Sequence, residues 1–142
     1  MPGMGEEVGP DSSVCRVEDE PTGRSLEARV QVVGEDLVVA VGGGERPHVG
    51  SLVLAQPVPS KRPGKPWSAS CSVLTIPPHK EEPLARGIAT RLAEALGRVT
   101  VVTAGVHDDG LDAEGIACYL RLGEELGEEL ARRLGEGKPR HE

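Results

Sequence analysis

Three internal histidines are the residues of this 142-residue chain whose types and positions best suit chemistry. His48 lies in the glycine-rich stretch VGGGERPHVG, His79 directly precedes a helical pattern, and His107 follows an apolar run. Each therefore falls at the end of a predicted strand or in an adjoining loop, where binding and catalytic sites usually form. If these ends converge, the three imidazoles meet. Three carboxylates would lie near them: Glu45, Asp108 and Asp109.

Three interpretations of the histidines stay open. As metal ligands, His48, His79 and His107 would suit zinc or a similar divalent ion, and the chain would be a metal-dependent enzyme such as a hydrolase. No HxH or HxxxH spacing supports that interpretation. In a ligand pocket they would bind an anion or tune a cofactor. As turn residues, each would satisfy only its local backbone.

Two segments have the composition of a phosphate site. In GGGERPHVG the glycines allow backbone N–H groups to approach an anion closely, and the alternative is a wide hairpin loop. In PPHKEEPLAR, His79 and Lys80 precede a helix whose N-terminus attracts anions, and Arg86 follows about a turn later. Ordinary capping with solvated charges explains this second segment equally well.

The segment WSASCSVLTIP alternates as a strand does, with serines on one face. A face formed by Ser68, Ser70 and Ser72 is too small and polar for a core, so we expect another group to approach this backbone closely. Cys71 and Cys118 fit a core better than a catalytic nucleophile, and no GxSxG motif occurs.

The elements that must position these residues follow from hydrophobic periodicity. The pattern predicts one α+β domain over residues 24–134, with about five strands in a mixed sheet, the order β-β-β-β-α-β-α, and two helices on one face. Residues 1–23 are expected to form a flexible arm and 135–142 a disordered tail. The predicted strands cover 25–33, 37–41, 51–57, 67–77 and 98–106, and the helices cover about 79–97 and 112–134.

Composition and charge exclude several classes of function. The net charge of −7 argues against nonspecific binding to a phosphate backbone, and one Trp, one Tyr and no Phe leave few rings for base stacking. No run approaches the ~20 apolar residues that cross a bilayer. Three widely spaced cysteines form no disulfide framework. We therefore expect a cytoplasmic protein that binds neither nucleic acid nor membrane.

Three segments together resemble the LpdD-like prenylated flavin chaperones, the small D subunits of gallate-type hydroxyarylic acid decarboxylases. They are GGGERPHVG, SASCSVLTIPPHKEEPLARGIATRLA and VTVVTAGVHDDGLDAEGI. The resemblance implies a non-catalytic accessory protein that binds prenylated FMN (or FMN) and delivers it to a UbiD-type decarboxylase. The N-terminal arm and the proline-rich SKRPGKPW loop are outside the resemblance.

The resemblance also implies which residues line a flavin or phosphate pocket. They are Gly43, Gly44, Glu45, His48, Ser70, His79, Lys80 and His107. The residue patterns add Ser68, Ser72 and Arg86 to this set of cofactor-binding candidates. A homodimer is also expected, because the sheet face without helices needs cover. A purely structural decarboxylase subunit is the other non-enzymatic alternative.

Overall fold

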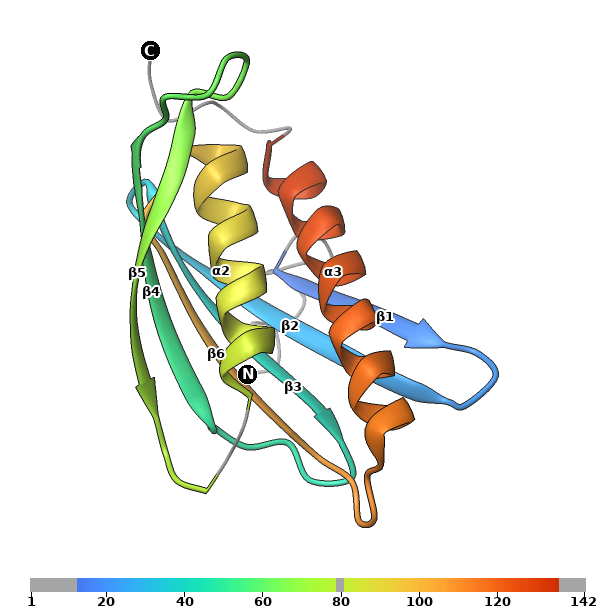
Figure 1. The fold of residues 1–142 in the computed structure, drawn as a ribbon. Coiled ribbons are helices and arrows are strands. Elements are labelled where there is room, and N and C mark those ends of the chain that lie inside the picture. The colour runs from blue at the N-terminus through green and yellow to red at the C-terminus, as the bar shows by residue number, and fades with distance from the viewer. Residues whose placement is uncertain (1–12, 79–80, 136–142) are drawn as a thin grey trace, which may run out of the picture.

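Alternating apolar residues build six strands of one mixed sheet in the computed structural model, which describes residues 13–78 and 81–135. Two helices cover one face of that sheet (Figure 1). The elements, in chain order, are β1 (Val14–Asp19), β2 (Arg24–Val33), β3 (Asp36–Gly44), β4 (Ser51–Pro59), β5 (Trp67–Thr75), α2 (Glu82–Leu96), β6 (Thr100–His107) and α3 (Ala113–Gly135).

The strand order is β1-β2-β3-β6-β4-β5, which places the apolar strand β6 inside the sheet. β3 and β6 pair in parallel, and the other neighbouring strands pair antiparallel. The registers put Val39 beside Val102 and Val53 beside Val102, so these buried side chains share the face under the helices. The hydrophobic core therefore lies between the sheet and α2 and α3.

Local interactions explain where α2 ends and where α3 begins. α2 has a proline in its first turn, and Gly97 closes it at φ 64°, a left-handed conformation that favours glycine. The Asp112 carboxylate accepts the Gly115 N–H at 2.8 Å at the start of α3. A Cβ on Gly123 would lie 2.4 Å from Leu84 Cδ1, so this glycine lets the helices approach. The described helices include none long and apolar enough to span a membrane.

The predicted α+β class and the single helix-covered face are confirmed, but the sheet has six strands instead of five. The additional strand, β1, lies inside residues 1–23, so the prediction of an arm is wrong for residues 14–19. Its apolar alternation spans only six residues, and Cys15 becomes buried by pairing opposite Ala28 of β2. At the other terminus, Gly135 ends α3 and is not part of a tail. Residues 1–12 and 136–142 lie outside the described residues.

The other face of the sheet carries no helix (Figure 1). Because side chains alternate between faces, the neighbours of the buried residues point there. On β3, β6, β4 and β5 these outward side chains are small or uncharged over most of the face. They include Val38, Ala40, Val101, Thr103, Leu52, Leu54, Ser70 and Ser72. We call these eight residues the open face.

Candidate functional site

The loop that follows β3 packs directly onto the end of β6. The N–H groups of Glu45 and Arg46 donate to the His107 carbonyl at 2.8 and 3.2 Å. A Cβ on Gly105 would lie 1.7 Å from the His48 carbonyl oxygen, and one on Gly42 would lie 2.9 Å from Pro47 Cβ. The space left by these two glycines is therefore filled by the chain's own loop.

Two other glycines of the motif also have structural reasons. The stretch predicted as a loop begins later than expected, because Gly43 and Gly44 belong to β3. A Cβ on Gly43 would lie 2.6 Å from the Ser25 carbonyl oxygen, on the crowded core face. Gly44 has φ 79°, and a Cβ there would lie 2.6 Å from the His107 carbonyl oxygen. The backbone geometry therefore explains both glycines.

His48 joins this loop to the start of α2 through Glu81. Its Nδ1 lies 3.1 Å from the Arg46 carbonyl oxygen, which can only accept, so Nδ1 carries a proton. Its Nε2 lies 3.0 Å from Glu81 Oε2, and both side chains are largely buried. This contact is an ion pair when the imidazole is protonated.

Glu81 also holds the backbone of β6 and β4 in place. Its Oε2 accepts the Val106 N–H at 3.1 Å, beyond the point where β4 separates from β6. A Cβ on Gly50 would lie 2.3 Å from Glu81 Oε1. That oxygen is buried without a hydrogen-bond partner among the described residues. Sequence reasoning assigned no role to Glu81.

His107 pairs with a different carboxylate. Its Nε2 lies 3.1 Å from Asp109 Oδ1, and Arg46 Nη2 donates to the same oxygen at 2.9 Å. These two hydrogen bonds hold the pKa of the Asp109 carboxyl below its usual range. The predicted meeting of three histidines is therefore not seen for His48 and His107, and His79 lies outside the described residues. Residues 13–78 and 81–135 contain no cluster of three metal-ligating side chains.

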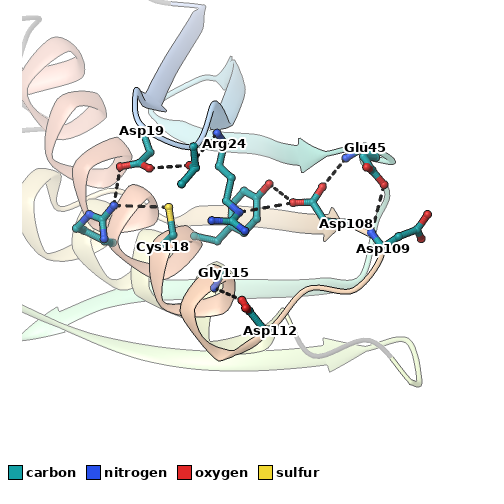
Figure 2. Close-up of polar contacts among 11 residues, drawn as sticks. Asp19, Arg24, Glu45, Asp108, Asp109, Asp112, Gly115 and Cys118 are labelled. Carbon is teal, nitrogen blue, oxygen red and sulfur yellow. Dashed lines mark hydrogen bonds and ion pairs between the residues drawn. The ribbon is translucent and has the colours of Figure 1, made fainter.

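Asp108 ties four segments together, as Figure 2 shows. Its Oδ1 accepts the Glu45 N–H at 2.8 Å, and its Oδ2 accepts the Tyr119 hydroxyl at 2.6 Å and lies 4.0 Å from Arg24 Nε. The Asp109 N–H returns to Glu45 Oε1 at 3.2 Å. This Asp108 network joins β2, the end of β3, the loop after β6 and α3.

Tyr119 is the buried member of the Asp108 network, and sequence reasoning missed both it and Arg24. Burial, and then the hydrogen bond to Asp108, raise the pKa of the Tyr119 hydroxyl. One signal was available: a single tyrosine in a chain without phenylalanine, within the last predicted helix. A buried tyrosine usually finds a partner for its hydroxyl.

The structure separates the predicted serine face from Arg86. Ser70 and Ser72 are exposed on the open face, and Ser68 on the same side is half-buried. Cys71 points the other way, and its Sγ lies 3.4 Å from Thr90 Oγ1 of α2. Arg86 is on α2 and forms an ion pair with Glu82. Arg86 and the serines therefore lie on opposite sides of β5, and Lys80 lies outside the described residues.

The chain is similar to known proteins over the residues of both the His48–Glu81 pair and the Asp108 network. Protein LpdD of Lactiplantibacillus plantarum (strain ATCC BAA-793 / NCIMB 8826 / WCFS1) is 27% identical over 115 residues, which cover 78% of this chain and 78% of that protein. A model of the family described as "Prenylated flavin chaperone LpdD-like domain" matches residues 20–135, from the end of β1 to the end of α3. The chain therefore belongs to the LpdD-like prenylated flavin chaperone family.

Proposed function

We propose that this protein binds prenylated FMN and delivers it to a UbiD-type decarboxylase without turning over substrate. The observation that carries the proposal is the family match, which extends over residues 20–135 and includes every described candidate residue. The polar side chains at the end of β6 support a role without turnover, because they are engaged with one another. His48 is held by Glu81, and His107 by Asp109.

The open face is the surface that best suits the flavin ring. A planar tricyclic ring can lie on a surface without bulky charged groups: Ser70 and Ser72 of β5 lie beside β4, whose Leu52 and Leu54 separate them from Thr103 and Ala40. Most ligand sites are similarly apolar with a few polar groups.

The phosphate of the cofactor needs a cation that is not already neutralised. Arg46 and His107 share Asp109, and His48 faces Glu81. The proposal keeps the phosphate at His79 and Lys80, which precede α2 in the sequence and lie outside the described residues, as expected from the sequence. In this proposal Gly43, Gly44, Glu45 and His48 shape the site, and Arg86 is the weakest candidate because it faces away from the serines.

The test is retention of the cofactor. Purified protein is mixed with reduced prenylated FMN under anaerobic conditions, free ligand is removed by gel filtration, and the absorbance spectrum is recorded. We expect retained flavin, and Lys80→Ala should weaken binding by ~1–3 kcal/mol because a charge-assisted hydrogen bond is lost. Lys61→Ala, in the exposed β4–β5 loop, is the matched control. A protein that retains no flavin at any concentration would refute the proposal.

Transfer to the partner enzyme is tested separately. Loaded protein is mixed with an apo form of a UbiD-type decarboxylase, and decarboxylation of its substrate is followed. Activity that appears faster than with free cofactor supports delivery. Equal rates with and without the protein would contradict it. A homodimer and a cytoplasmic location are parts of the same proposal.

A further inference from the structure

The two edges of the sheet differ in length and charge. The edge strand β1 has six residues, and three of them are charged: Arg16, Glu18 and Asp19. The edge strand β5 has nine residues, WSASCSVLT, with no charged residue and no proline. Native edge strands are usually short, charged or interrupted, because an exposed edge pairs with other chains. β1 has these protections and β5 lacks them.

The backbone of β5 presents unpaired groups along its whole length. The Ile76 N–H donates to the Gly50 carbonyl at 2.9 Å, and the Ser60 N–H to the Pro66 carbonyl at 3.0 Å, at the two ends of the β4–β5 pair. In an antiparallel pair every second residue bonds across the pair and the others point outward. The outward residues of β5 are Trp67, Ala69, Cys71, Val73 and Thr75.

These five residues offer five N–H donors and five C=O acceptors to a further strand. Among residues 13–78 and 81–135, the N–H groups of these five residues make no backbone hydrogen bond on the edge of β5 that faces away from β4. The corresponding outward side of β1 is different. There Arg133 Nη1 of α3 donates to the Val14 carbonyl at 3.2 Å. Only the β5 edge is both long and free of such contacts.

We propose that β5 pairs antiparallel with β5 of a second copy of this chain, around a two-fold axis at Cys71. Cys71 is the central residue of the strand. In that register Trp67 lies opposite Thr75 of the second copy, and Ala69 opposite Val73, so every outward group of both strands is used. The strand is uncharged, so self-pairing meets no like-charge repulsion. A second copy closes the edge with an isologous contact.

The helix that packs against β5 has charges that suit the same axis. Thr90 of α2 lies at the level of Cys71, because their side chains are 3.4 Å apart. Arg86 and Glu94 lie one helical turn to either side of Thr90. The two-fold axis places Arg86 level with Glu94 of the second copy. Within one chain Arg86 pairs with Glu82 and Glu94 pairs with Lys65, so across the axis each ion pair meets the other, with Arg86 and Glu94 of opposite charge at the same level.

Two-fold symmetry and the charges of α2 both argue against a parallel pairing of the two β5 strands. A parallel pair of two β5 strands cannot be related by a closed two-fold axis at Cys71, and it would bring Arg86 level with Arg86. The inference does not depend on flavin binding, because it uses only the backbone of β5 and the charges of α2. It specifies the contact of the homodimer named with the proposed function, and it can fail or succeed separately from flavin binding.

The test is the mass of the full-length protein in solution and the exchange of its backbone amides. Sedimentation equilibrium should give twice the 14.9 kDa of one chain. Ala69→Pro removes an outward N–H without touching the β4–β5 hydrogen bonds, so it should give a monomer. Arg16→Pro removes the equivalent outward N–H of β1 and should stay dimeric. Hydrogen exchange should protect the amides of Cys71 and Val73 in the dimer.

A second variant covers the case in which Ala69→Pro fails to fold, as judged by circular dichroism. Ser70→Asp combined with Ser72→Asp places carboxylates opposite each other across the proposed pairing, on the solvent side of β5, and should also give a monomer. A wild-type protein that is monomeric overturns the proposal. A dimer that persists after this double substitution, while its β5 amides exchange their hydrogens freely, also overturns the proposal. The contact would then lie elsewhere, for example on the open face or on a strand of another protein.

Discussion

Asp108 and Glu81 are two partly buried carboxylates near the end of β6. Their hydrogen-bond and charge partners differ. Asp108 accepts from the Tyr119 hydroxyl and the Glu45 N–H and lies near Arg24. Glu81 accepts the Val106 N–H and faces His48. The first carboxylate has donors that do not titrate near neutral pH, and the second depends on a histidine.

This difference assigns different roles to the two clusters. The Asp108 network fixes the loop after β6 to α3 and β2, and its donors keep their protons over the physiological range. The His48–Glu81 pair connects the glycine-rich loop to the residue that precedes α2, through a single contact between two titratable side chains. We therefore interpret the Asp108 network as a rigid anchor and the His48–Glu81 pair as the adjustable contact beside the proposed phosphate position.

The largest effect is expected from Asp108→Ala. It leaves the buried Tyr119 hydroxyl without its acceptor and removes one of the two acceptors of the Glu45 N–H, which should lower the free energy of unfolding by about 3 kcal/mol. Urea denaturation followed by circular dichroism measures the loss. Asp109→Ala is the matched control, because Asp109 is 72% exposed, and it should cost much less. Equal losses would mean that Asp108 is not an anchor.

A smaller effect is expected from Glu81→Gln. The amide keeps the size of the side chain and can still accept the Val106 N–H, but the charged contact to His48 is lost. We expect a loss of ~1–3 kcal/mol in the free energy of unfolding, with faster hydrogen exchange in the segment around His48. Glu82→Gln, one residue away in an exposed pair with Arg86, is the control. Unchanged exchange near His48 would contradict the role of Glu81.

The smallest effect is a change of stability with pH that appears only in alkaline solution. The raised pKa of Tyr119 means that the folded protein keeps this proton after the unfolded chain, with a tyrosine pKa of about 10, has lost it. The stabilisation is complete below about pH 10 and is lost as pH rises through the folded-state pKa. Tyr119→Phe should remove this slope, measured as the urea midpoint against pH. An identical slope in the variant would assign it to other groups.

Sequence reasoning found the residues of the candidate site in part. It placed His48, Glu45 and His107 at strand ends, and the structure brings their loops together at the end of β6. It did not find Glu81, Arg24 or Tyr119, because each lies in a segment whose own pattern is satisfied by an ordinary helix or strand. Glu81 bonds the N–H of Val106, 25 residues away, and Arg24 lies near Asp108, 84 residues away (108 − 24), so neither pairing leaves a local signal.

The sequence by itself determined the periodic elements, their order, and the single face that both helices cover. These follow from local alternation and helical spacing of apolar residues, which fix the side that must be buried. The tertiary structure alone decided the pairing of polar groups. Whether His48 meets Glu81 or Asp109 depends on strand register and on the turn into α2, and those are set by the packing of the whole core. β1 also needed the assembled sheet, because six residues bury one face only when β2 lies beside them.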